Sequence, residues 1–394
     1  KNANASEESA QLIAKVVADA SDDLVNKVVE EVSKNSTDEN QSLSAQALKA
    51  IVDTEPNKLE VINEDVKDTM IKQTIESAQN QQEGTGVQQT QDMTSIVSDI
   101  IVNSNTETGS KMIEELNNSA ADKDNNLSLQ VISDISEKDT TKLNTLSENN
   151  KEQIEKLTET AIKNANASEE SAQLIAKVVA VASDELVNKV VEEVSKNSTE
   201  ENQALSAKVM KSIVETNPEK IETLSDENKE TIITQTIEAA KNQSEGTSTD
   251  EIDLTNTIAE IVTKSDTTTA AKVLEKLDEA SDESDSKLSL SVVSNLTKQE
   301  NYEEKMEILS VTSTIVEQSI TKLVEKAVEN ASSEEDLELV TNIVENSKGT
   351  IADKVINSAN NSEESKKKIT EIIVKVVETN PEKAIEIIEN NKNT

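Results

Sequence analysis

The chain of 394 residues carries 78 acidic and 39 basic residues, a formal net charge of −39, and contains no Cys and no His. These absences exclude a disulfide framework and the commonest zinc and iron ligands. Every basic residue is Lys and the single aromatic residue is Tyr302, so we expect no nucleic-acid partner, because phosphate binding needs clustered basic residues and base stacking needs aromatic ones.

The sequence is built from long repeats. Residues 1–84 return almost unchanged as residues 163–246, an offset of 162, and a proline motif marks the same place in three successive copies. A weaker similarity at an offset of 84 divides each long repeat in two. We therefore predict five helical units, at residues 1–84, 85–162, 163–246, 247–329 and 330–394. The last unit is partial, so we expect the chain to be a piece of something longer.

Two short helices open each long repeat. Apolar residues at helical spacing form one face over residues 12–20 and a second face over residues 24–32. Between them, Ser21 is predicted to cap the second helix, with two acids in the first turn, where the helix dipole favours negative charge. Further apolar faces over residues 43–52 and 66–75 predict two more helices.

The proline motif predicts one more short helix between those two. Asn217 precedes Pro218 and Asn380 precedes Pro381, so each Asn is expected to cap a helix whose first residue is proline. In the first copy a Glu, which is a poorer cap, precedes Pro56. We expect these prolines and their caps to have structural roles.

All of these elements are helical. Strict apolar alternation is absent and only five glycines interrupt the chain, which disfavours strands. Helices this short need neighbours to be stable. We therefore predict an all-α fold, a right-handed α-solenoid of short antiparallel helix hairpins, with units of about 80 residues paired into a long repeat of 162. In spacing this resembles the HEAT and armadillo class of α-solenoids, which implies a shape and no particular partner.

Little in the sequence indicates chemistry. No GxSxG, P-loop or GxGxxG motif is present, so we expect no enzyme, no cofactor and no small-molecule substrate. The acidic segments Asp122–Asn126 and Asp282–Asp285 suggest weak calcium binding at most, because Leu127 replaces the glycine of an EF-hand loop and Ser133 stands at its twelfth position. No stretch approaches the roughly 20 apolar residues that cross a bilayer, so no membrane insertion is expected.

The faithful repetition of exposed segments such as SEESAQ and SKNST favours duplication for length. The prediction is a non-enzymatic structural protein, part of a long extracellular fibre, stalk or adhesin shaft at the cell surface. Its expected partners are copies of itself or further repeats of the same chain. This organisation resembles that of bacterial surface proteins with long tandem repeats.

Two alternatives remain open. One is a cytoplasmic α-solenoid scaffold whose concave acidic face binds basic protein partners. The other is a hydrophilic desiccation-type protein that is helical only when dried, although the periodic apolar faces argue against a disordered chain.

Overall fold

The computed structural model describes residues 7–36, 42–84, 92–120, 126–165, 168–198, 204–244, 252–282, 287–312, 314–331, 333–347, 350–358 and 363–390. Within these ranges every regular element is a helix, with α1 to α22 and two short 3-10 helices, η1 and η2. The chain divides into two compact units, Lys1–Leu205 and Ser206–Thr394.

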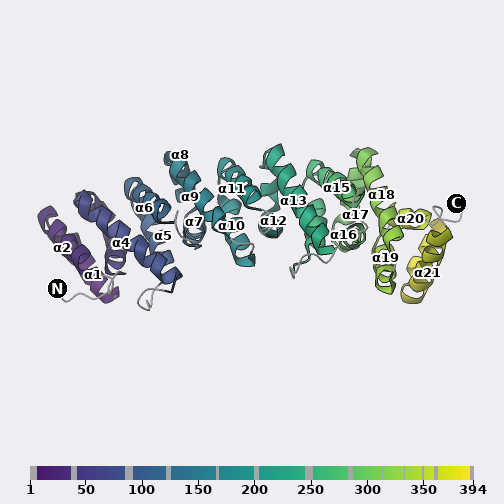
Figure 1. Ribbon diagram of the computed structural model, residues 1–394, viewed down its shortest axis with the longest axis horizontal. Helices are drawn as coiled ribbons and strands as arrows, with labels where there is room; N and C mark the ends of the chain where they lie inside the picture. Colours follow the sequence, from purple (N-terminus) through teal and green to yellow (C-terminus); the bar gives the residue numbers. More distant parts are fainter. Residues whose placement is uncertain are drawn as a thin grey trace. The chain divides into compact units, whose positions relative to one another are not determined.

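The first unit is a stack of antiparallel helical hairpins that follow one another in chain order (Figure 1). Helices α1, α3, α5, α7 and α10 contact one another in succession and form one layer, and α2, α4, α6, α9 and α11 form the other. The short α8 packs against α7 and α9. The elements are α1 (Glu7–Asp19), α2 (Asp22–Asn35), α3 (Ser42–Thr54), η1 (Pro56–Val61), α4 (Glu64–Gln82), α5 (Met93–Asn103), α6 (Thr106–Ala120), α7 (Leu127–Lys138), α8 (Thr140–Asn149), α9 (Lys151–Lys163), α10 (Glu169–Val181) and α11 (Asp184–Asn197).

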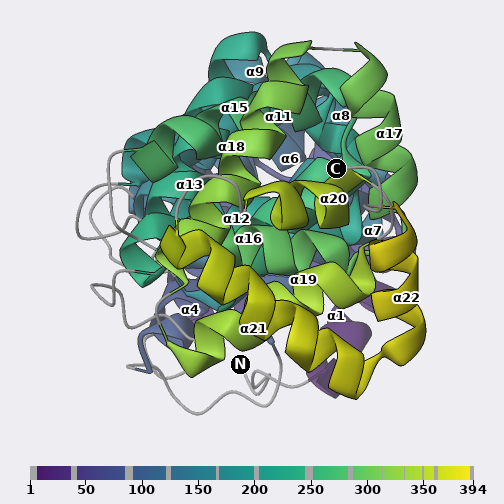
Figure 2. The ribbon, with the colours of Figure 1, turned by 90° about the vertical axis from the view of Figure 1, so that its right-hand side faces the viewer.

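The second unit repeats this arrangement. Helices α14, α16, α19 and α21 form one layer, and α13, α15, α18 and α20 form the other (Figure 2). The extra helix α17 packs against α15, α16 and α18. The elements, with the first two residues of α12 still in the first unit, are α12 (Ala204–Thr216), η2 (Pro218–Ile221), α13 (Asp226–Ser244), α14 (Leu254–Lys264), α15 (Thr267–Asp282), α16 (Leu288–Thr297), α17 (Tyr302–Thr312), α18 (Thr314–Asn330), α19 (Glu334–Asn346), α20 (Thr350–Asn357), α21 (Glu363–Thr379) and α22 (Pro381–Asn390).

The core is a thin aliphatic seam between the two layers. In α2, Val25, Val29 and Val32 are buried, as the apolar spacing predicts, whereas Leu24 of the same predicted face is exposed. In α3 the whole stretch from Ser42 to Val52 is buried apart from Lys49 and Ala50. Tyr302 is also buried, and its hydroxyl donates to the carbonyl of Asn346 at 3.1 Å. These observations confirm the predicted all-α fold of stacked hairpins and its resemblance to α-solenoid proteins.

Side-chain caps fix where several helices begin. The Asp92 carboxylate accepts hydrogen bonds from the amides of Thr94 and Ser95 at the start of α5, and Ser333 and Asp336 form a reciprocal capping box at the start of α19. Each cap satisfies amides that have no partner inside their helix. The division into five units stays a prediction.

Candidate functional site

The residues predicted to be structural lie at helix starts, with different local geometry in each copy. Pro56 and Pro218 begin the 3-10 helices η1 and η2, whereas Pro381 begins the α-helix α22. Before α22, the side chain of Asn380 accepts a hydrogen bond from the Lys383 amide at 3.2 Å. The side chain of Asn217 makes no capping hydrogen bond to η2.

Ser21 occupies the N-cap position of α2, and its side chain makes no capping hydrogen bond. In the second copy, Ser183 takes the same position before α11 and accepts from the Leu186 amide at 3.5 Å. The structural roles proposed for these residues therefore rest on their positions at the helix ends.

Sequence reasoning missed a set of lysines that bind helix C-termini. The ammonium of Lys58 donates to the carbonyl of Ala20 at 2.9 Å and that of Lys142 to the carbonyl of Ser104 at 2.7 Å. Lys305 makes the same contact with Ser265. Burial lowers the pKa of Lys142 and of Lys305. Each lysine places positive charge at the negative end of a helix dipole from the preceding hairpin. The sequence signals for this set are the spacing of 84 between Lys58 and Lys142 and the spacing of 163 between Lys142 and Lys305.

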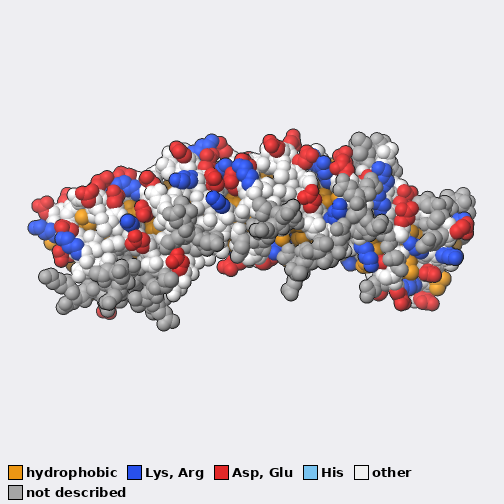
Figure 3. All heavy atoms as spheres, viewed as in Figure 1, with side chains coloured by type: hydrophobic (Ala, Val, Ile, Leu, Met, Phe, Trp, Pro, Cys, Tyr) orange, Lys and Arg blue, Asp and Glu red, His pale blue; other side chains and the backbone are white. Residues whose placement is uncertain are grey.

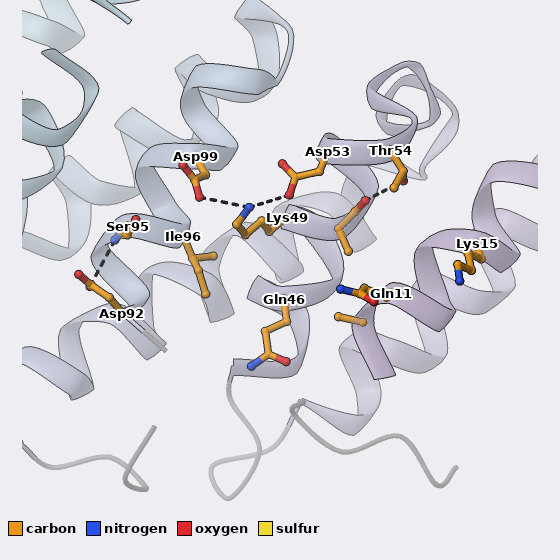
Figure 4. Close-up of a pocket in the computed structure, with 12 residues that line it drawn as sticks. Gln11, Lys15, Gln46, Lys49, Asp53, Thr54, Asp92, Ser95, Ile96 and Asp99 are labelled. Carbon is orange, nitrogen blue, oxygen red and sulfur yellow. Dashed lines mark hydrogen bonds and ion pairs between the residues drawn. The ribbon is translucent and has the colours of Figure 1, made fainter. Parts of the chain in front are cut away.

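A pocket of about 510 Å³ opens on the layer formed by α1, α3 and α5 (Figure 4). Its apolar lining comes from Ala10, Ala50 and Ile96. Carboxylates lie at its edge, Asp53 near the end of α3 and Asp92 at the start of α5. Lys15, Lys49 and Asp99 line it as well, so the pocket combines apolar side chains with charges of both signs.

A ladder of alternating charges runs from this pocket across α5 to α7. Lys49 lies 2.6 Å from Asp53 and 3.2 Å from Asp99. Asp99 also lies 2.9 Å from Lys138, which is 3.7 Å from Asp134. We call these five residues the charge ladder. Because it begins and ends with an acid, it keeps a net negative charge.

Further carboxylates lie close enough to repel one another. Burial raises the pKa of Asp134, and the neighbouring carboxylates of Asp92 and Glu137 add to the rise, although Lys138 opposes it. On the other layer, burial and repulsion by nearby acids, including Glu114, raise the pKa of Glu115. Figure 3 shows acidic side chains along the edge of the first unit over α2, α4 and α6. Added positive charge near these acids would be favourable.

The second copy replaces part of the charge ladder with amides. The positions of Asp134 and Lys138 are taken by Asn295 and Gln299. Asn295 donates to Asp253 at 3.2 Å and to the Thr255 hydroxyl at 2.9 Å, and Gln299 donates to Asn256 at 3.0 Å. The exposed face of this half-repeat thus differs in chemistry between copies, even though the helices match.

This difference between copies predicts the effect of Asp134→Asn. The new amide can donate to Asp92 and Thr94, as Asn295 donates to Asp253 and Thr255, so we expect the free energy of unfolding at pH 7 to rise by about 1 kcal/mol. The pKa of Asp134 is raised in the folded state, so at a given acidic pH the folded wild type binds more protons than the unfolded chain. The contribution of Asp134 to the free energy of unfolding therefore falls as the pH rises from the ordinary pKa of an aspartate through the raised pKa.

In the Asp134→Asn variant the free energy of unfolding does not show this fall with pH, because the amide does not titrate. Urea unfolding of both proteins across the acidic range checks the prediction, and a variant that is less stable at pH 7, or whose advantage does not grow from acid to neutral pH, contradicts it. Asn295→Asp in the second copy serves as the reverse control, with an expected loss of stability at pH 7.

The structure bears on the predicted calcium segments and on membrane insertion only where it describes the chain. The calcium segments Asp122–Asn126 and Asp282–Asp285 fall almost wholly outside the described residues. Among the side chains that the structure does describe, no cluster of three or more Asp or Glu is arranged to hold a metal ion. The described helices include none with the length and apolar character needed to cross a bilayer.

Comparison with known proteins gives matches in structure alone. No sequence family model and no curated protein sequence matches the chain. Among solved structures it is similar to PUF-8 in complex with PBE-RNA, with 9% identity, a TM-score of 0.43 and coverage of 86% of this chain and 90% of that one. It is also similar to the RNA-binding domain of yeast Puf5p bound to MFA2 RNA, with 10% identity, a TM-score of 0.41 and coverage of 99% and 91%. A circular tandem repeat protein matches with 16% identity, a TM-score of 0.31 and coverage of 98% and 93%.

Two predictions from the sequence are corrected by these comparisons. The extracellular fibre, stalk or adhesin shaft is wrong, and so is the partner prediction that admitted only copies of the chain and excluded nucleic acid, because the natural proteins found are RNA-bound helical repeats. The premise of the fibre prediction, repetition of segments such as SEESAQ and SKNST, does not extend to the other half-repeat, where exposed positions on α5 and α7 differ from those on α14 and α16. The likeness to the RNA-bound proteins concerns the stacked helical repeats alone.

Proposed function

We propose that the chain is a non-enzymatic helical-repeat scaffold that binds basic segments of partner proteins. The observation that carries this proposal is the excess of carboxylates that remains after ion pairing. Acids outnumber lysines by two to one, 78 against 39, and even the charge ladder, with two lysines, ends in acids on both sides. A Lys-rich or Arg-rich segment would meet an attractive potential on either layer of the first unit.

The raised pKa values of Asp134 and Glu115 support the same proposal. Each carboxyl group is partly buried among other acids, so an approaching cation would relieve repulsion that the lysines of the chain leave in place. The location proposed with this function is the cytoplasm, the alternative that the sequence left open, and fluorescence microscopy of the tagged chain in its source cell tests it.

Binding of labelled peptides to the full chain tests the function. We expect a peptide rich in Arg and Lys to bind, and a Glu-rich peptide of the same length to show no binding. Raising ionic strength from 0.01 M to 0.15 M shortens the Debye length from about 30 Å to about 8 Å. We therefore expect the association rate to fall on the order of tenfold.

Single-stranded RNA is the third probe in this experiment. Failure of the basic peptide to bind at low salt contradicts the proposal, and so does binding of RNA that is tighter than that of the basic peptide under the same conditions. Binding of the basic peptide that does not weaken with salt also contradicts it, because electrostatic attraction is its stated cause.

A further inference from the structure

We propose that the groove between α1 and α2 binds an amphipathic helix of a partner protein, aliphatic on one side and basic on the other. This inference rests on the proposed function, because it gives the partner's basic segment a conformation and a site. Three features carry it: the exposed aliphatic side chains of the groove, the way in which the second copy fills the same groove, and the charge of the α1–α2 hairpin.

The groove between α1 and α2 is apolar and open. Its volume is about 270 Å³. Its apolar lining comes from Ile13, Val28, Val32 and Leu43. Beside it, Val16 on α1 and Leu24 on α2 are 49% and 46% exposed. Covering such side chains with an apolar partner is favourable because it removes aliphatic surface from water.

The second copy shows what this groove accepts. All seven residues that line it are identical in the two copies. The counterparts of Val16 and Leu24 are Val178 and Leu186, and each of these is only 3% exposed. Helices α7 and α9 pack on α10 and α11 there. The cavity that remains is about 10 Å³ and is lined by Leu129, Ile132, Thr158, Ala161, Ile162, Ile175, Val178 and Val190. The groove is therefore complementary to helices with aliphatic side chains.

Helix α9 is the template for the bound helix. It lies beside α11 (Figure 1). At its start, Lys151 forms an ion pair with Glu185 of α11. At its end, the carbonyls of Ile162 and Ala165 accept hydrogen bonds from the Asn197 side chain at 2.6 and 3.1 Å. These contacts at both ends hold α9 parallel to α11.

The first copy retains the groups that make these contacts. Asp23, which is exposed, stands at the position of Glu185, and Asn35 stands at that of Asn197. The Asn35 side chain donates to the Glu31 carbonyl of its own helix at 2.6 Å, a bond that it can exchange for a carbonyl of the bound helix. The partner helix is therefore expected to run parallel to α2, with a basic residue near Asp23.

The charge of the hairpin favours a basic helix over an acidic one. Residues 7–35 contain seven acids and three lysines. One of these lysines, Lys34, already pairs with Glu30 of its own helix at 2.6 Å. A helix that places aliphatic side chains in the groove and lysine or arginine around it would satisfy both the apolar lining and the excess of carboxylates.

The other two lysines of the hairpin are compatible with such a helix. Lys27 lies at the rim of the groove. Its counterpart Lys189 pairs with Glu193 of its own helix at 2.8 Å while α9 is packed on α11. The counterpart of Lys15 lies 2.7 Å from Glu137 of α7. Lys15 therefore faces the place of α7, and a helix in the place of α9 does not meet it.

Two peptides of equal length and charge test the inference on the full chain at low ionic strength. The first is residues 150–165 with Glu152→Lys and Glu159→Lys, which keeps the aliphatic face of α9 and makes its exposed side basic. The second has the same composition, with the aliphatic residues distributed around the helix. We expect the wild type to bind the first peptide on the order of tenfold more tightly.

The groove variant Val16→Gln/Leu24→Gln should bind both peptides with equal affinity. Both positions are about half exposed, so the variant is expected to fold, and urea unfolding checks its stability. The matched control is Val374→Gln/Val377→Gln on α21, where the side chains are 52% and 46% exposed. This control removes similar apolar surface and should keep the preference for the first peptide.

The outcomes separate the two proposals. If both peptides bind the wild type equally, or if the preference survives in the groove variant, the groove inference is wrong and the proposed function stands. Loss of the preference in the α21 control also overturns the inference. If neither peptide binds, both proposals fail. Sedimentation of the chain alone tests the other occupant, because a dimer that dissociates in the groove variant would place a second copy in the groove and overturn the inference.

Discussion

Ile100→Ala is expected to lower the free energy of unfolding by about 3 kcal/mol, within the range of 2–5 kcal/mol for such truncations. Ile100 lies in α5 and is fully buried. The substitution removes apolar contacts and leaves a cavity that the surrounding hairpins fill only in part. Because each hairpin is stable only through its neighbours, we expect the loss to extend to α3 and α7, which pack on either side of α5.

The matched variant is Ile261→Ala in α14, the same position in the second copy, where the side chain is 1% exposed. If the two copies pack alike, the two substitutions should lower the free energy of unfolding by similar amounts. Hydrogen exchange measures where the protection is lost, and urea unfolding measures the energy. A loss below about 1 kcal/mol for Ile100→Ala would show that the hairpin interior is not packed as the structure has it.

The helices could be predicted from the sequence because their signals are local. Apolar faces over residues 12–20 and 24–32 correspond to α1 and α2, and the near-identical copy gives the same pattern again. The spacing of apolar residues along one helix predicts which side faces the core, although Leu12, Val16 and Leu24 of these two faces are exposed. Because the core is only two layers deep, aliphatic side chains alone are enough to fill it.

The contacts between hairpins could not be predicted in this way. Lys58 and Ala20 are 38 residues apart, as are Lys142 and Ser104. Such contacts depend on how one hairpin is positioned against the next, and no local pattern in the sequence encodes the position of one hairpin relative to its neighbour. The proline motif shows a similar limit, since the sequence predicts a helix start at Pro56 and Pro381 alike but does not distinguish a 3-10 helix from the α-helix α22.

The pocket was missed for a related reason. Its residues come from three helices, and residues 1–84 and 163–246 agree at so many positions that the changes of Gln46 to Lys208 and of Ala50 to Ser212 do not stand out. Further differences lie in the other half-repeat, where Ile96 and Asp134 of the first copy become Thr257 and Asn295. A position-by-position comparison of the two copies therefore shows where their exposed faces differ although their helices match.

Lys326→Met in α18 is expected to destabilise the second unit by about 2 kcal/mol. Its ammonium lies 2.7 Å from the Asp278 carboxylate in α15 and donates to the Asp278 carbonyl at 3.0 Å. Asp278 is 7% exposed, so loss of this partner leaves a largely buried negative charge. Removing one member of a fully buried pair costs about 3–5 kcal/mol. The effect is smaller here because Lys322 remains 3.2 Å from the same carboxylate.

The first copy indicates a second substitution that should restore the stability lost in Lys326→Met. Asn117 occupies the position of Asp278, is 2% exposed and donates to the Gln153 carbonyl at 3.0 Å. A neutral amide is therefore stable at this place in the hairpin. The double variant Asp278→Asn/Lys326→Met should recover most of the stability that Lys326→Met loses, because no unpaired charge remains. Urea unfolding of the wild type, both single variants and the double variant gives the coupling energy directly. A coupling close to zero would show that the ion pair contributes nothing to holding α15 and α18 together.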